Sequence, residues 1–161
     1  MTTIRAAEAE DLDRLMEIEA LTFPPVEQAA RETFSYRLHY LGSWFFAAEE
    51  AGQIVGLING RTTPLSAIHD ELYEPAELPE GRWLALLCVE TDPRWQRQGV
   101  ARTLIEAFIQ KARREGLWGV TLACKDALIP YYASFGFCHM GVSVSVHGGA
   151  IWIDMRLDFT L

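Results

Sequence analysis

The sequence lacks long apolar runs, an ordered cysteine pattern and an excess of positive charge. No stretch approaches the roughly 20 apolar residues that cross a bilayer, so we expect no membrane span. The first 15 residues lack the basic-then-apolar pattern of a signal peptide. Cys88, Cys124 and Cys138 have neither metal-ligand nor disulfide spacing. Reduced thiols in a cytoplasm fit them best, and we expect no bound metal.

The charge balance disfavours one class of partner. With 22 Asp and Glu against 14 Lys and Arg, the formal net charge is −8. Such a surface repels nucleic acid and tolerates or attracts cationic small molecules, although acidity also serves solubility alone. Half the residues are hydrophobic, which is ordinary for a globular chain of 161 residues. We therefore expect one domain over residues 1–161, a monomer or homodimer that binds neither nucleic acid nor membrane.

Hydrophobic periodicity predicts the element order β-α-α-β-β-β-α-β-α-β-β. The predicted strands are 3–7, 44–50, 53–62, 82–91, 118–124, 137–146 and 150–159, and the predicted helices are 8–23, 27–41, 99–115 and 127–135. The nearly continuous apolar run at 82–91 predicts a central strand covered on both faces. Residues 63–81 are predicted to be a loop with one helical turn. This order predicts an α/β (α+β) fold with a central mixed sheet of about seven strands and helices on both faces.

A glycine stands between that strand and the next helix, in DPRWQRQGVARTL (92–104). A helix N-terminus presents unpaired N–H groups and a partial positive charge, and Gly99 lets an anion approach where a Cβ would intrude. The nucleotide-binding patterns GxxxxGK[ST] and GxGxxG are both absent here. The pattern present is Q-x-x-G-x-A, formed by Gln96, Gly99 and Ala101. It predicts an anion site at this corner.

With this pattern the sequence resembles the GCN5-related N-acetyltransferase (GNAT) superfamily. The lead-in DPRW (92–95) and the downstream YYASFGF (131–137) extend the resemblance. It is closest to the arylalkylamine and polyamine N-acetyltransferase branch, through 17–24, 124–137 and 152–155. The resemblance implies the GNAT fold and transfer of an acetyl group from acetyl-CoA to a primary amine, by direct attack in a ternary complex.

The resemblance also implies where each substrate binds. The backbone of Val89, Glu90 and Thr91 would hold the pantetheine arm as an added strand, and a backbone N–H near Val89 would face the thioester oxygen. The pyrophosphate would lie on Arg97, Gln98, Gly99, Val100, Ala101 and Arg102. The acceptor would contact Phe23, Pro24 and Glu27, with the loop at 63–81 beside them.

Tyr132 aligns with the tyrosine proposed as general acid in this family. A phenol of pKa about 10 can protonate a departing thiolate when it is well positioned. The alternative is that Tyr132 is an ordinary core aromatic residue. Cys88 and Cys124 are predicted to be small buried hydrophobes and not nucleophiles.

The general base is where the resemblance fails. The arylalkylamine enzymes carry two histidines on the strand before the loop, and the matching positions here are Ala85 and Leu87, which take no proton. Glu90 lies on the same strand, but its side chain alternates to the opposite face. The other open candidates are Glu19, Glu27, Asp70, Glu71, Glu74, His39 and His69, or an amine that arrives neutral. A coenzyme-binding module with weak or no transfer, and a protein or peptide N-acetyltransferase, are the alternative functions.

Overall fold

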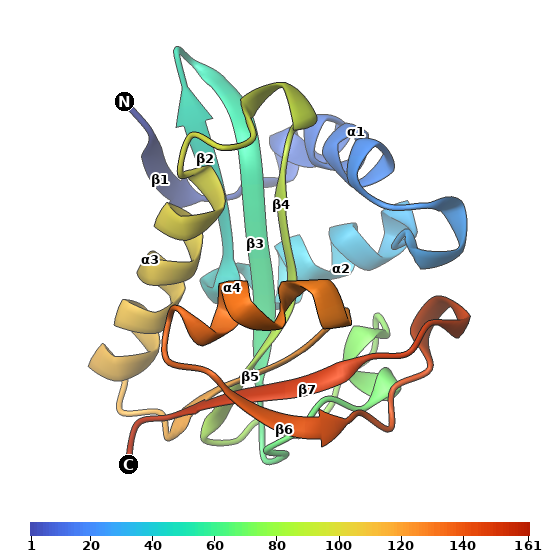
Figure 1. Cartoon of the computed structure of the whole chain (residues 1–161). Helices are drawn as coiled ribbons and strands as arrows, with labels where there is room; N and C mark the ends of the chain where they lie inside the picture. Colours follow the sequence, from blue (N-terminus) through green and yellow to red (C-terminus); the bar gives the residue numbers. More distant parts are fainter. The chain divides into compact units, whose positions relative to one another are not determined.

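The computed structural model describes all 161 residues and confirms the predicted fold class and element order. Seven strands form one mixed sheet in the order β1-β2-β3-β4-β5-β7-β6 (Figure 1). The strands are β1 (Thr3–Ala6), β2 (Phe45–Glu50), β3 (Gln53–Thr63), β4 (Trp83–Thr91), β5 (Gly119–Cys124), β6 (Cys138–Val142) and β7 (Ile153–Asp158). The main helices are α1 (Leu12–Thr22), α2 (Arg31–Tyr40), α3 (Val100–Arg114) and α4 (Ile129–Ala133). None of these helices is long and apolar enough to cross a membrane.

Several predicted boundaries are wrong: the helix predicted from residue 8 begins at Leu12, the strand predicted from residue 150 begins at Ile153, and two further differences have a clear physical reason. The helix predicted from residue 27 begins at Arg31, because Pro25–Glu27 form a separate 3-10 turn and both Gln28 and Ala30 have extended backbone. The strand predicted over 137–146 ends at Val142. Beyond it, the Ser145 hydroxyl and the Val146 N–H donate to the carboxylate of Asp70, so this segment is bonded to a loop instead of a strand.

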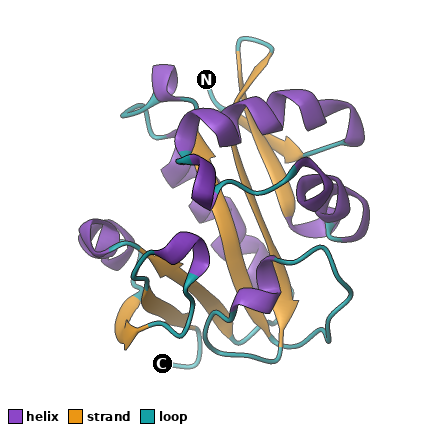
Figure 2. Cartoon of the chain, turned by 90° about the vertical axis from the view of Figure 1, so that its right-hand side faces the viewer, coloured by secondary structure: helices purple, strands orange, loops and turns teal.

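The chain divides into two compact units, and the first comprises Met1–Gly60 with Cys88–Phe108. In it, β1, β2 and β3 pair antiparallel. Helices α1 and α2 lie on one face of these strands and α3 on the other (Figure 1). In Figure 2, where the right-hand side of Figure 1 faces the viewer, α1 and α2 lie in front of the strands. Their apolar side chains bury a core with the strands, including Leu15, Ile18, Phe34, Phe45 and Leu57.

Gly56 of β3 sets how closely α3 approaches the strands. A Cβ at this position would lie 2.7 Å from Val100 Cγ1 and 2.8 Å from the Glu90 carbonyl oxygen. Only a residue without a side chain fits between these atoms. The first turn of α3 and the end of β4 are therefore seated directly against β3.

The second unit comprises Arg61–Leu87 with Ile109–Leu161. Here β5 pairs parallel with β4 and antiparallel with β7, which in turn pairs antiparallel with β6. The loop after β3 carries the predicted helical turn at Asp70–Tyr73. Arg61, 4% exposed, holds this loop by donating to the carbonyl oxygens of Glu74 and Ala76. The single domain expected over 1–161 stays a prediction.

Candidate coenzyme-binding and active site

The glycine corner is an exposed loop at the N-terminus of a 15-residue helix. Residues 96–99 are all exposed, and α3 begins at Val100. The backbone of Arg97 has φ +64° and that of Gly99 has φ +81°. The Thr103 N–H makes the first helical bond, 3.0 Å from the Gly99 carbonyl oxygen, so the preceding N–H groups have no acceptor within the helix. A Cβ at Gly99 would meet no atom within 4 Å, and the corner is open to an anion.

Asp92 anchors this loop to the first unit. Its side chain has no exposed surface and accepts from the Arg94 N–H at 2.9 Å, from Arg94 Nη2 at 2.8 Å and from Arg14 Nη2 at 2.6 Å. Its own N–H donates to the Val55 carbonyl oxygen at 2.8 Å. Of the three arginines in the motif, Arg94 is therefore committed to holding the loop, and Arg102 lies 3.7 Å from Glu106 on the exposed helix face.

Replacing Asp92 with asparagine is expected to lower the free energy of unfolding by about 2–3 kcal/mol at pH 7, because two arginines lose their buried counter-charge. Hydrogen bonds from Arg94, and then from Arg14, hold the pKa of this carboxyl well below its ordinary 3.8. The folded state therefore binds fewer protons than the unfolded chain, and the stabilisation is present above pH 4 and lost as pH falls toward the lowered pKa. Urea unfolding at pH 7 and pH 3 checks this. A deficit in the variant that is as large at pH 3 as at pH 7 would contradict it.

The end of β4 offers an unpaired backbone edge. Its pairing with β5 runs from Trp83–Gly119 to Ala85–Thr121 and stops there, although β4 continues to Thr91. The side chains of Val89 and Thr91 are half-buried, and that of Glu90 is buried. N–H and C=O groups on such an edge accept an added extended chain. Residues 89–91, predicted to hold the pantetheine arm, therefore have the backbone geometry for that role.

Ala85 and Leu87, the positions at which the arylalkylamine enzymes carry histidines, belong to an apolar cluster in the second unit. Ala85 is fully buried with Ile68 and Leu72, and Leu87 packs against them. No proton acceptor lies in that cluster. Asp70 is occupied by Ser145 and Val146, and the remaining candidates of the loop, Glu71 and Glu74, are exposed. His39 is exposed beside Tyr40, with ring centroids 4.4 Å apart, and His69 precedes the turn at 70–73 without capping it through its side chain.

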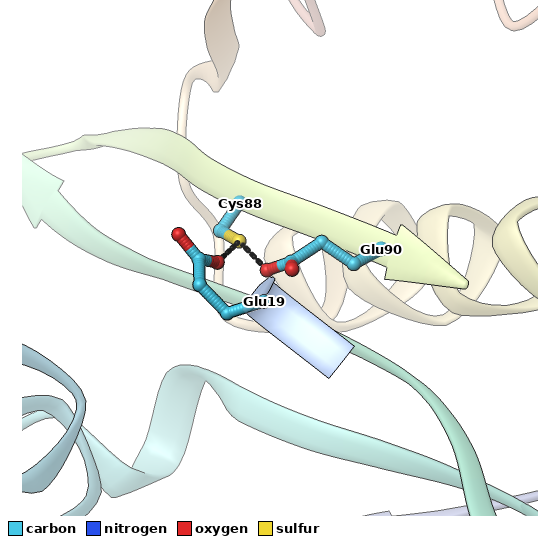
Figure 3. Close-up of side chains that lie close together, drawn as sticks. All are labelled: Glu19, Cys88 and Glu90. Atoms are coloured by element: carbon cyan, nitrogen blue, oxygen red, sulfur yellow. Dashed lines mark hydrogen bonds between the residues drawn. The ribbon is translucent and has the colours of Figure 1, made fainter. Parts of the chain in front are cut away.

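Two carboxyl groups instead lie close together in the first unit, beside Cys88 of β4 (Figure 3). Glu19 of α1 and Glu90 of β4 are each 2% exposed, and Cys88 between them is 8% exposed. The Cys88 thiol donates to Glu90 Oε2 and, at 3.7 Å, to Glu19 Oε1. Burial raises the pKa of Glu90 well above its ordinary value, with contributions from the hydrogen bond and the charge of Glu19. Burial and then the charges of Glu90 and Glu19 raise the pKa of the Cys88 thiol.

Cys88 is therefore buried as predicted, but it is not merely apolar. It packs in the core of the first unit and also donates a hydrogen bond to a carboxyl group. Sequence reasoning missed the cluster because Glu19 lies 69 residues before Cys88 in the chain. The available signal was that Cys88 and Glu90, two residues apart on a strand, share a face.

The segment between α1 and α2 contains the predicted acceptor residues. Phe23 ends α1 and packs on the core of the first unit, Pro24 is exposed, and Glu27 is buried. This segment is tied to the carboxyl cluster, because the Ala29 N–H donates to Glu19 Oε2 at 2.6 Å. The structure thus brings the predicted acceptor segment and Glu19 together.

Tyr132 lies on α4 in the second unit. It is 7% exposed, and its ring contacts Phe137 edge-on at 6.0 Å between centroids. Tyr131, beside it, packs edge-on against Phe135, with ring centroids 5.3 Å apart.

Cys124 is buried and is not placed to act as a nucleophile. Its burial, and to a smaller extent the charge of Asp126, raises the pKa of its thiol to about 11. Such a thiol is a poor nucleophile at neutral pH.

Comparison with known proteins identifies the family. Residues 12–137 match the family described as "Acetyltransferase (GNAT) family", and the chain belongs to it. No curated protein matches the chain.

Solved structures share the fold. The loading GNATL domain of CurA from Lyngbya majuscula matches with a TM-score of 0.84 at 17% identity, over 99% of this chain and 98% of that one. The ribosomal-protein-S18-alanine N-acetyltransferase of Escherichia coli matches with a TM-score of 0.77 at 21% identity, over 100% and 96%. A GNAT family acetyltransferase from Brucella melitensis in complex with acetyl-CoA matches with a TM-score of 0.64 at 21% identity, over 99% and 88%.

Proposed function

We propose that this protein transfers an acetyl group from acetyl-CoA to a primary amine of arylalkylamine or polyamine type, by direct attack in a ternary complex. The observation that carries this is the exposed loop at Gly99, where the first N–H groups of α3 have no helical acceptor, directly after the edge of β4 that β5 leaves unpaired. A diphosphate and an extended amide-containing arm need these two features in this order. The acidic chain, with a net charge of −8, favours a cationic acceptor over a nucleic acid.

In this proposal, residues 97–102 hold the pyrophosphate through backbone N–H groups, and residues 89–91 hold the pantetheine arm. The Val89 N–H stabilises the oxyanion that develops when the amine nitrogen attacks the thioester carbon. The C–S bond then breaks, Tyr132 gives the departing sulfur a proton, and the proton that the nitrogen loses as the amide forms restores the Tyr132 hydroxyl. We place the reaction in the cytoplasm, without a metal and with a monomer or homodimer as the working form.

A thiol-release assay tests the proposal across aromatic, aliphatic and polyamine acceptors, with N-terminal and lysine peptides in the same panel. Turnover of peptides alone would replace a small amine with a protein or peptide acceptor. Coenzyme binding without turnover of any amine would make the protein a coenzyme-binding module.

Replacing Tyr132 with phenylalanine is expected to lower kcat about 100-fold and to leave the KM for acetyl-CoA nearly unchanged, because a positioned acid acts on the transition state and not on ground-state binding. Tyr131→Phe is the matched control, since it removes the adjacent hydroxyl from a ring that packs on Phe135. Steady-state kinetics of both variants check this. An equal effect of the two substitutions on kcat would remove Tyr132 from the mechanism.

A further inference from the structure

The side chains of Glu19, Cys88 and Glu90 cannot all be ionised. One ligand-type atom from each lies within 4.8 Å of the others, and all three side chains are buried (Figure 3). Three negative charges this close in a buried site repel one another too strongly to coexist. The cluster therefore requires compensation by protons or by cations.

The cation that faces the cluster is Arg37 of α2. It is 4% exposed, donates to Asn59 Oδ1 of β3 at 3.0 Å, and lowers the pKa of both Cys88 and Glu90. One guanidinium balances one carboxylate. The neutral arrangement is thus one ionised carboxylate, one protonated carboxyl and a protonated thiol. A divalent metal would need all three groups deprotonated and would face the charge of Arg37, so protons fit this cluster better.

One carboxylate oxygen of the Glu19–Glu90 pair accepts no hydrogen bond. Oε1 of Glu90 is buried and has no hydrogen-bond partner, whereas Oε2 accepts from the Cys88 thiol. A buried oxygen of this kind is costly to keep unless it is used. Glu90 is also the residue next to Val89 on the predicted coenzyme strand, and Glu19 bonds the predicted acceptor segment at Ala29. The pair therefore touches both parts of the chain where the two substrates are expected.

We infer that the Glu19–Glu90 pair is the proton acceptor for the incoming ammonium group, the role that Ala85 and Leu87 cannot fill. This inference rests on the proposed function. The ionised member of the pair takes one proton from R–NH3⁺, and the freed lone pair on nitrogen forms the bond to the thioester carbon. The C–S bond breaks, the sulfur takes the proton of Tyr132, and the second proton that the nitrogen loses as the amide forms returns to the Tyr132 oxygen. The doubly protonated pair then faces Arg37, which favours release of one proton to solvent and restores the starting state.

Glu90→Gln is the test, because glutamine keeps the shape of the side chain and cannot take up a proton. At pH 7 we expect kcat/KM to fall at least about 100-fold with an alkylamine, which is almost entirely protonated at that pH. With an aniline, which arrives neutral, the loss is expected to stay below about tenfold. The loss with the alkylamine should shrink as pH approaches the pKa of the amine. Glu32→Gln, the same substitution on the exposed start of α2, is the matched control.

Stability separates this role from a structural one. A structural carboxyl would weaken the fold when replaced, whereas we expect the thermal midpoint of Glu90→Gln to be unchanged or higher, because the amide has no ionised form to bury. Should Glu90→Gln not fold, Glu19→Gln serves for the same measurements.

Three results would overturn the inference alone, with the wild-type protein active on amines. They are equal losses with alkylamine and aniline, wild-type activity in Glu90→Gln, and a thermal midpoint that Zn²⁺ raises in the wild type but not in Cys88→Ala. A wild-type protein that binds coenzyme A and acetylates no amine would instead overturn the proposed function, and this inference with it.

Discussion

Gly99→Val is expected to lower the affinity for coenzyme A at least about 100-fold, equivalent to about 2.7 kcal/mol of binding free energy. The isopropyl group would occupy the open space in front of the loop, where a Cβ on residue 99 would have no atom of the chain within 4 Å. That space is where a phosphate must come close enough to accept from backbone N–H groups. Isothermal calorimetry with coenzyme A gives the affinity directly.

Gly52→Val is the matched control for this change. Gly52, in the turn between β2 and β3, has φ +78° against +81° at Gly99, and a Cβ there also meets nothing within 4 Å. The two valines therefore impose the same backbone strain, on the order of 1–2 kcal/mol of unfolding free energy. Only Gly99→Val should also weaken coenzyme binding. Equal coenzyme affinities in the two variants would show that this corner does not hold the pyrophosphate.

Gly119→Ala is expected to lower the free energy of unfolding by about 3 kcal/mol or more. A Cβ at this position would overlap the Leu157 carbonyl oxygen and would lie 2.7 Å from Trp83 Cζ3 and 3.1 Å from the Asp158 Cα. The Leu157 and Asp158 atoms belong to the backbone of the paired strand β7, which cannot move without breaking the ladder. Urea unfolding followed by circular dichroism measures the change.

The control is Gly42→Ala, where a Cβ meets no atom within 4 Å and the backbone needs no positive φ. Its expected effect is a stabilisation of less than about 1 kcal/mol, since alanine restricts the unfolded chain. If the two variants unfold at the same urea concentration, the close approach of β5 and β7 at Gly119 is not a constraint on the fold.

The fold was predictable because its signals are local. Apolar residues at helical spacing place α1 and α3, and the continuous apolar run places β4 in the sheet interior. The errors came where a distant partner decides the conformation. Ser145 and Val146 look like the continuation of an alternating strand, and Asp70, more than seventy residues earlier, captures them instead.

The glycine corner could also be predicted from a local signal, whereas the carboxyl pair depends on residues distant in the chain. The glycine corner is contiguous, so its pattern could be recognised in a single stretch of sequence. The carboxyl pair joins residues 19 and 90, and no local pattern connects them. Strand alternation predicted Glu90 on the face opposite Ala85 and Leu87 and so counted against it as the base. What alternation could not reveal is that α1 brings a second carboxyl, that of Glu19, next to Glu90.

The buried pair also makes the fold sensitive to alkali. Because burial raises the pKa of Glu90, the native state binds its proton more tightly than the unfolded chain does. Native stability therefore declines as pH rises from the ordinary value of 4.5 through the raised pKa, the reverse of the trend set by Asp92. Replacing Glu90 with a neutral residue would remove this loss of native stability at high pH. An engineered variant stabilised in this way would be a hardier protein and, on our inference, a poorer catalyst.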